Sequence, residues 1–418
     1  MAIFQALSFA AILVGCGACE LTRAPQAESF PSYRRFAPSV PVKILTPGEG
    51  RIMQHFFDKS PISPSGRWVA LLRLPYEDRR AAPGDAADVI LVDLKTGEER
   101  KIAESRAWEH QVGACVMWGT CDDELYFNDV RVGEWEPFLV RLNPTTGERR
   151  EFPGGAFVIS PDGTKAAGYN LKTVRRMNFY GYGAAIPPEA MPINGAMPED
   201  DGLFVTDLTT GRRRLVRSIA SFFRETLTEA DRRELSHGAS YGFQVKWSPD
   251  GEWLLFVVVQ ALNDEQPGSG KSKWRRMIFS CRPDGSEPHL ALHWNIWAKG
   301  GHHLNFHPDS RTVTMNLTGP DGNLCLMKFD VYGSAPTPLC GLVRGSGHPS
   351  VSPDGRWLVT DGTLDDHLSM VAAEAGKDIH LISLARDLDE KYLEQLGEIV
   401  EKEGVGGSKN GSLRLSLS

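Results

Sequence analysis

The chain is poor in cysteine, has no excess of positive charge, and carries no long hydrophobic run beyond its N-terminus. Of 418 residues, 7 are cysteine, and 46 Lys and Arg stand against 53 Asp and Glu, which gives a formal net charge of -7. This balance creates no global field that would attract nucleic acid, so we expect no nucleic-acid partner. An anionic ligand would need a local group of Arg and His. The lack of an internal apolar run predicts no internal membrane-spanning helix.

The cysteines also lack the spacing of a metal-binding or redox pair. Five of them follow the N-terminal segment: Cys115, Cys121, Cys281, Cys325 and Cys340. None of these five forms a C-x-x-C pair, so the sequence does not indicate a zinc ribbon. Cys115 and Cys121 could form a disulfide in an oxidising compartment, but we favour small buried side chains in strands.

The first fifteen residues are apolar and precede Cys16, which is the pattern of a signal-peptide core. Leu13-Val14-Gly15-Cys16 is similar to a bacterial lipobox, in which Cys16 would be acylated. No Lys or Arg precedes the apolar run, and a buried N-terminal strand or helix is the alternative. We predict a signal peptide over 1–16 and a linker over 17–41. The protein would then be periplasmic, an outer-membrane lipoprotein or secreted, with membrane contact only through a lipid anchor.

Glycine and proline, by contrast, are abundant, with 42 and 27 residues. This abundance favours many short strands joined by turns. One turn phrase recurs, in full or in part, at Ser63-Pro64-Ser65-Gly66, Ser160-Pro161-Asp162-Gly163, Ser248-Pro249-Asp250-Gly251, Ser352-Pro353-Asp354-Gly355, His307-Pro308-Asp309-Ser310 and Gly119-Thr120-Cys121-Asp122. Proline fixes φ, the Asp side chain bonds locally and glycine accepts a positive φ, so the phrase predicts a tight hairpin turn.

A second apolar hairpin follows each of these turns, as in Val89–Leu94 with Thr96-Gly97. Two hairpins per unit make a four-stranded antiparallel sheet, and radial repetition of such sheets is a β-propeller. We therefore predict an all-β propeller over residues 42–386. Six blades are clear, and a seventh, begun by the strand at 42–48, would close the ring. Residues 387–418 are predicted to be a helical and low-complexity tail.

The widest gap between turn phrases holds two insertions. One is a loop rich in Met, Pro and Gly at about 172–201, and the other is a helix near 217–236, in which Thr228 could cap Glu229–Leu235. Long loops on a propeller usually lie over one face and build the site.

Histidines occur at one shared level of the predicted central channel. Four residues before the turn phrases stand Lys59, Cys115, Ala156, Gln244, His303 and His348. His303 and His348 come from neighbouring blades, and the glycines beside them allow close approach of a ligand. Neutral imidazoles there could hold a divalent metal or act as a general base, although histidines are also common structural residues.

Further polar residues precede inner strands or lie in the long insertion. They are His55, His110, Tyr241, Arg175, Arg176, Tyr180 and Tyr182. An Arg near a Tyr suits an acidic sugar, because the guanidinium pairs with the carboxylate and the ring stacks on a sugar face. A loop packed by its own aromatic rings is the alternative.

The repeated turn units resemble those of the TolB-like propeller superfamily over about 50–385. The segments Trp108–Gly113, Arg175–Gly183, Trp297–His303 and Gly345–Asp354 resemble propeller polysaccharide lyases that act on uronate linkages, including rhamnosyl-glucuronate and ulvan lyases. The paired histidines with Gln244 also resemble oligogalacturonate lyases, whose site holds manganese through His and Gln. This resemblance implies Gln244, His303 and His348 as ligands of a divalent metal (Mn, Ca or Zn), with His302 as a fourth. The chain lacks the last Ser-Pro-Asp-Gly unit that the resemblance would imply.

The resemblance implies β-elimination on an acidic polysaccharide or oligosaccharide. In that reading Arg176, or a metal on His303 and His348, neutralises the uronate carboxylate, and His110 or Tyr182 exchanges protons. The remaining candidates would bind substrate: His55, Arg175, Tyr180, Tyr241 and His302. The competing hypothesis is a non-catalytic propeller that binds glycan or protein in the periplasm or at the cell surface.

Overall fold

A computed structural model of the chain describes most of residues 51–360. The described residues are 30–32, 43–46, 51–76, 78–79, 81–174, 186–262, 274–339 and 347–360, together with the backbone of 340–344, 378–383 and 412–416. In this part of the chain no helix is long and apolar enough to cross a membrane. The predicted signal segment and residues 175–185 of the long insertion lie outside it.

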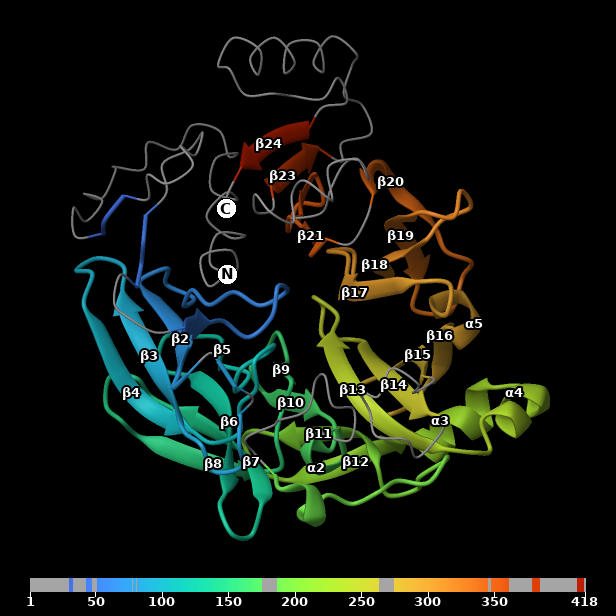
Figure 1. Ribbon diagram of the computed structural model, residues 1–418, viewed down its shortest axis with the longest axis horizontal. Helices are drawn as coiled ribbons and strands as arrows, with labels where there is room; N and C mark the ends of the chain where they lie inside the picture. Colours follow the sequence, from blue (N-terminus) through green and yellow to red (C-terminus); the bar gives the residue numbers. More distant parts are fainter. Residues whose placement is uncertain are drawn as a thin grey trace.

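Six four-stranded antiparallel sheets follow one another along the chain and are arranged radially, with their first strands toward the centre (Figure 1). The first three sheets are β1 (Arg51–Met53), β2 (Trp68–Leu74), β3 (Ala87–Asp93) and β4 (Glu99–Ser105); β5 (Met117–Trp118), β6 (Leu125–Arg131), β7 (Glu136–Leu142) and β8 (Arg149–Pro153); and β9 (Val158–Ile159), β10 (Lys165–Gly168), β11 (Gly202–Asp207) and β12 (Arg213–Ser218). In each sheet the strands pair in chain order.

The other three sheets continue the series. They are β13 (Ala239–Trp247), β14 (Leu254–Ala261), β15 (Trp274–Cys281) and β16 (His289–Leu292); β17 (Gly301–Phe306), β18 (Thr312–Thr318), β19 (Leu324–Asp330) and β20 (Thr337–Arg344); and β21 (Ser350–Val351), β22 (Trp357–Thr360), β23 (Asp378–Ser383) and β24 (Ser412–Ser416). The predicted all-β propeller of four-stranded blades is confirmed. A seventh blade stays a prediction, because within 42–48 the structure describes only 43–46, where Lys43 forms an isolated bridge with Ser32.

The end of the chain requires a correction. Residues 412–416, which we assigned to a tail, form β24 and pair with β23 from Ile382↔Ser412 to Asp378↔Ser416. The propeller therefore extends beyond residue 386. Ser412-Leu413-Arg414-Leu415-Ser416 alternates polar and apolar residues as a strand does, and our assignment of the Gly/Ser/Leu-rich stretch to a tail overlooked this signal.

The repeated Ser is what makes each turn recognisable in the structure. In four copies its hydroxyl accepts the backbone N–H five residues on, as from Trp68 to Ser63 (3.1 Å) and from Trp253 to Ser248 (2.9 Å). The glycine three residues after the Ser has φ between 70° and 76°, and its N–H donates a hydrogen bond to the Ser carbonyl. The positive φ explains why the phrase ends on glycine.

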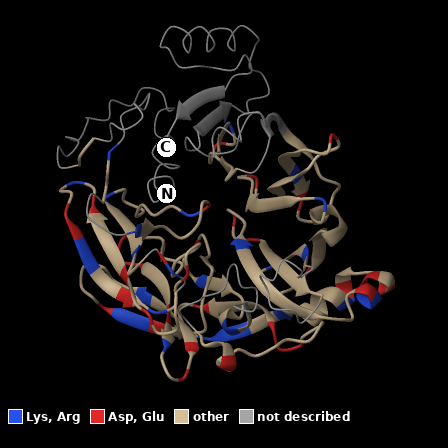
Figure 2. Ribbon diagram, in the orientation of Figure 1, with Lys and Arg blue, Asp and Glu red and all other residues tan. Residues whose placement is uncertain are grey.

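The core lies between the sheets, and the outer strands carry the charge. All nine residues of β13 are buried. The outermost strands β4, β8 and β12 are rich in Arg, Lys and Glu (Figure 2). Charged side chains on these edges disfavour pairing with another molecule. Cys115 and Cys121 are not joined by a disulfide. The favoured reading of buried cysteines in strands holds for Cys281 of β15, whereas Cys115 is buried just before β5 and Cys121 is exposed.

The helical insertion confirms the predicted cap. α3 (Ile219–Thr226) and α4 (Glu229–Glu234) follow β12, and Thr228 forms a reciprocal capping box with Asp231. Short helical turns also occur at α2 (Leu171–Val174), η3 (Pro188–Ala190) and α5 (Trp294–Trp297). Phe222 of α3 stacks on Phe279 with a centroid distance of 4.9 Å. This ring contact packs the insertion on the fourth sheet.

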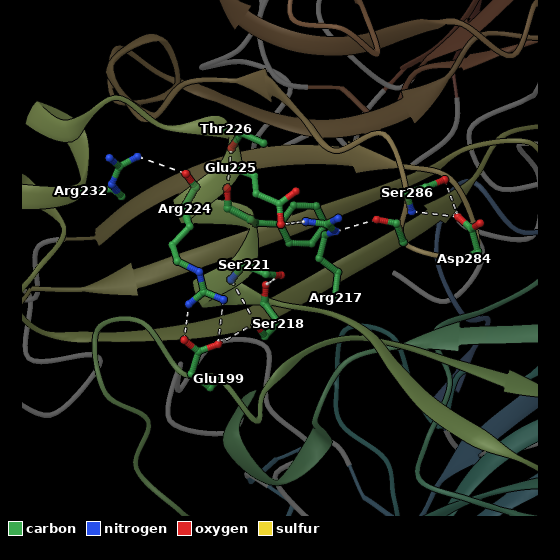
Figure 3. A network of polar contacts seen from close by, with 12 residues as sticks. Glu199, Arg217, Ser218, Ser221, Arg224, Glu225, Thr226, Arg232, Asp284 and Ser286 are labelled. Atoms are coloured by element: carbon green, nitrogen blue, oxygen red, sulfur yellow. Dashed lines mark hydrogen bonds and ion pairs between the residues drawn. The ribbon is translucent and has the colours of Figure 1, made fainter.

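Polar contacts hold α3 to two sheets (Figure 3). Ser218 caps the helix by accepting the backbone N–H of Ser221, and Arg224 pairs with Glu199 in the preceding loop. Arg217 pairs with Glu225 at 2.7 Å and donates from Nε to the Gly285 carbonyl of the fourth sheet at 2.6 Å. The insertion is therefore fixed across the third and fourth sheets.

Candidate active site

The two histidines that the sequence places at one level of the channel lie against each other. His303 is on β17, and His348 lies two residues before β21. Their ring centroids are 3.9 Å apart, with an angle of 30° between the planes. The ring of His302 lies 4.4 Å from that of His303. Three imidazoles therefore gather where the fifth and sixth sheets meet.

The backbone fixes the orientation and tautomer of His303. Its Nδ1 donates to the Gly347 carbonyl at 2.6 Å, and Asn316 Nδ2 donates to the same oxygen at 2.7 Å. A carbonyl can only accept, so Nδ1 carries the proton and the neutral ring has its lone pair on Nε2. Such a backbone contact is what positions imidazoles that bind metal or exchange protons.

One segment of the first sheet reaches these rings. We call residues 54–59, between β1 and β2, the central segment; in Figure 1 the chain after β1 runs toward the middle of the ring. Phe56 and Phe57 are each 3% exposed. The Phe57 centroid lies 5.5 Å from that of His303 and 5.4 Å from that of His348, and the Phe56 distances are 6.4 and 6.5 Å. The central segment therefore packs two buried aromatic rings beside the histidine pair, and both histidines stay partly exposed.

A buried ion pair anchors the central segment. Asp58 Oδ2 lies 2.7 Å from Lys246 Nζ of β13, and both side chains are 2% exposed. Burial lowers the pKa of Lys246 to about 8, although the Asp58 charge opposes this shift. Burial alone would raise the pKa of Asp58, but the ammonium groups of Lys246 and Lys59 hold it well below its usual range. The Lys246 ammonium also lies 5.1 and 5.5 Å from the centroids of Phe56 and Phe57.

His55 of the central segment is buried. Its Nε2 donates to the Phe157 carbonyl at 2.9 Å, and its ring meets the Phe157 ring edge to face at 4.9 Å. Burial lowers the pKa of His55 to about 4, so the ring is neutral at pH 7. We predicted a substrate contact for His55, and that role stays a prediction for a side chain that is 2% exposed.

Gln244 is one of the residues of β13 whose side chain has an unsatisfied polar atom. It lies on β13, two residues before Lys246, and its Oε1 is buried without a hydrogen bond to any described residue. Tyr241, on the same strand, is 3% exposed. Two imidazoles and an amide oxygen are donors that divalent cations accept. Within the described residues, however, no group of three or more His, Cys, Asp and Glu side chains is placed to hold a metal ion.

His110 has its contacts elsewhere. It is exposed, its Nε2 donates to the Arg79 carbonyl at 3.1 Å, and its ring meets Trp108 at 5.3 Å. Neither contact involves the histidine pair. The other predicted residues of the insertion, Arg175, Arg176, Tyr180 and Tyr182, lie outside the described residues.

Sequence reasoning did not single out Phe56, Phe57, Asp58 or Lys246. One signal could have found Lys246: it lies two residues after Gln244 in a predicted strand, so both side chains face the same side. A lysine in a strand whose other residues are all buried indicates a charged partner nearby. Asp58 stands directly before Lys59, which the turn alignment had already placed at the channel.

A groove of about 980 Å³ lies apart from the centre, at the turn ends of the third and fourth sheets. Its lining includes Asp162, Asp207 and Asp284, and hydrogen bonds within their own turns lower the pKa of each. These carboxylates are therefore already used by the repeat. The groove therefore offers space, but its three Asp carboxylates are engaged in the turns.

Known proteins resemble this chain in fold. No family model and no curated protein sequence matches it. An oligogalacturonate lyase from Vibrio parahaemolyticus is similar over 85% of this chain and 82% of that chain, with a TM-score of 0.51 and 13% identity. TolB from Acinetobacter baumannii aligns with a TM-score of 0.38 and 12% identity over 70% of this chain and 55% of that chain. An oligogalacturonate lyase in complex with manganese aligns at 0.36 and 16% over 79% and 92%.

The likeness is one of architecture. The alignment with the Vibrio lyase agrees with the β-propeller that the turn phrases predict. At 12–16% identity the likeness does not decide between a lyase and a non-catalytic propeller. Function must be argued from the side chains at the centre.

Proposed function

We propose that this protein binds a uronate-containing polysaccharide or oligosaccharide and cleaves it by β-elimination at the His303–His348 pair. The observation that carries the proposal is the stacking of the two rings at 3.9 Å, with His303 held by the Gly347 carbonyl as the Nδ1–H tautomer. This tautomer leaves an imidazole lone pair to accept a proton. In this proposal the protein is exported, as a periplasmic, lipid-anchored or secreted propeller.

The reaction needs charge neutralisation and two proton transfers. A base removes the proton beside the uronate carboxylate, a carbon–carbon double bond forms as the neighbouring C–O bond breaks, and the leaving oxygen takes a proton. In the metal-free form of the proposal, Arg176 neutralises the carboxylate and His303 is suited to accept the first proton through Nε2. In the metal-bound form Nε2 is a ligand, and His110 or Tyr182 stays our prediction for the proton exchange.

The metal-bound form of this proposal contains a divalent metal (Mn, Ca or Zn), as the alternative to His303 acting as the base. His303, His348 and Gln244 would hold it, because two imidazoles lie together and the Gln244 oxygen is buried without a hydrogen bond to any described residue. When bound, the cation would neutralise the carboxylate and so acidify the adjacent C–H. Metal analysis of the purified protein before and after chelation tests this element independently of activity.

A non-catalytic glycan- or protein-binding propeller is the second candidate. The observation that favours it is the packing of Phe56 and Phe57, each 3% exposed, against the histidine pair. The two rings occupy one side of the pair and so leave the imidazoles only partly exposed to a substrate.

Digestion of glucuronate- and galacturonate-containing glycans, followed by ultraviolet absorbance of the unsaturated product, tests the proposal. His303→Ala and His348→Ala should abolish product while the melting temperature stays within a few degrees. His237→Ala is the control, since His237 is exposed beyond α4. A folded wild-type protein that yields no product from any glycan of the panel, yet binds one, would support the binding module instead.

A further inference from the structure

The central segment combines a buried charge with several unsatisfied polar atoms. Four such atoms make no hydrogen bond among the described residues: Gln54 Nε2, Gln54 Oε1, His55 Nδ1 and Asp58 Oδ1. Each of them would bond to water if the segment moved outward, so its buried position carries a cost. The opposing gain is burial of the Phe56 and Phe57 rings. The two effects act in opposite directions on the same six residues.

The Asp58–Lys246 ion pair determines which kind of ligand could displace the central segment. A buried ammonium that loses its partner is strongly destabilising, so Lys246 must stay paired when the central segment moves. A carboxylate from outside supplies the same charge and the same oxygen acceptors as Asp58. A neutral sugar supplies no negative charge to replace that of Asp58. The exchange conserves the buried ion pair and returns Asp58 to water.

We propose that Lys246 is the carboxylate-binding residue of the central site, and that Asp58 occupies it until the carboxylate of a uronate residue takes its place. The inference rests on the proposed function, because it assigns the substrate's acidic group to one side chain. It also predicts that the histidine pair, which is partly exposed, becomes more exposed when the uronate binds. Phe56 and Phe57 are the neighbours of Asp58 in sequence, so displacement of Asp58 moves their rings away from His303 and His348.

Binding of free glucuronate and galacturonate to the full-length protein, measured by calorimetry, tests the assignment. Asp58→Asn removes the internal competitor's charge while its amide oxygen can still accept from Lys246. We expect uronate binding to become at least tenfold tighter, with glucose and galactose unaffected. Asp93→Asn is the matched control: Asp93 is also buried and pairs with Arg67 at 2.9 Å, but it lies at the β3 turn. Its uronate affinity should equal that of the wild type.

The role of Lys246 is tested in a double variant in which no buried charge lacks its partner. Lys246→Met by itself strands Asp58 and could prevent folding, whereas Asp58→Asn combined with Lys246→Met removes both charges. This double variant should fold and lose the uronate affinity that Asp58→Asn gains. Equal affinity of Asp58→Asn and wild type, or retained affinity in the double variant, overturns the proposal.

Amide hydrogen exchange provides a second measurement. The Lys59 N–H donates to the Phe56 carbonyl at 3.1 Å within the central segment. Saturating uronate should speed exchange across 54–59, and Asp58→Asn should speed it without ligand. Unchanged exchange in both cases contradicts the displacement. Because neither assay requires turnover, a protein that passes both and forms no unsaturated product refutes the lyase reaction alone.

Discussion

Glu109 is a buried carboxyl whose ionisation should set how the stability of this propeller depends on pH. It lies in the turn between β4 and β5 and is 5% exposed. Its carboxyl oxygens accept the backbone N–H groups of Gln111, at 2.8 Å, and Val112. Burial raises the pKa of Glu109 to about 8, and the two backbone hydrogen bonds only partly oppose this shift.

The sign and size of the effect follow from proton linkage. In the unfolded chain the carboxyl returns to the ordinary pKa of 4.5, so between pH 4.5 and about 8 the folded state binds the extra proton. The free energy of unfolding therefore falls as pH rises through this window, by about 1.4 kcal/mol per pH unit at most. Summed over this window, we expect a total loss of roughly 3–5 kcal/mol between pH 4.5 and 8.

Glu109→Gln removes the titration and nearly preserves the shape of the side chain. Denaturant unfolding of both proteins from pH 5 to 8 gives two stability curves, and their difference cancels every other titrating group. We expect the variant to gain on the wild type by roughly 1 kcal/mol per pH unit. The variant's amide places a donor near one backbone N–H, which lowers its stability by a constant and leaves the slope untouched. Parallel curves would refute the assigned burial of an ionisable Glu109.

Three other perturbations test the packing by chemical denaturation. Gly285→Ala should lower the free energy of unfolding by roughly 2 kcal/mol more than Gly147→Ala does. Both glycines have positive φ, but a Cβ at Gly285 would overlap the Val216 carbonyl, whereas a Cβ at Gly147 would meet open space. Equal losses in the two variants would contradict that contact. His55 has a folded pKa of about 4, below the unfolded 6.5, so stability should fall by roughly 3 kcal/mol as pH drops from 6.5 to 4, and His55→Gln should abolish this dependence. Phe222→Ala should cost about 3–5 kcal/mol and loosen α3, and a loss under about 1 kcal/mol would mean that the insertion does not pack on the fourth sheet.

The repeat made the architecture predictable because its signal is local. Each Ser hydroxyl accepts an N–H five residues on, and each glycine supplies the positive φ that closes the turn. These contacts depend on neighbours in sequence, so the phrase predicts a hairpin wherever it stands. The same alignment counted residues back from the turn and brought His303 and His348 to one level. Their ring contact at 3.9 Å follows from that shared register.

The packing of the central segment against the histidines was not predictable in this way. Phe57 contacts His348 across almost the whole chain, and Asp58 pairs with Lys246 from another sheet. Such contacts depend on how the ring of sheets closes, and no period of two or repeated phrase encodes them. The central segment also has no regular secondary structure, so its sequence contains no pattern that predicts its direction.

The repeat provides the position of the site, and the side chain at that position provides the chemistry. Cys115 stands four residues before its turn, as His303 does, and both adopt the left-handed backbone region, with φ of 53° and 59°. A positive φ outside glycine is costly, so on its own it would suggest a strained functional residue at His303. It recurs at a buried cysteine in another sheet but not at the other four residues of this level, so the positive φ does not by itself mark a functional residue. What distinguishes the fifth sheet is an imidazole there whose Nδ1 donates to a neighbouring backbone carbonyl, beside a second imidazole from the next sheet.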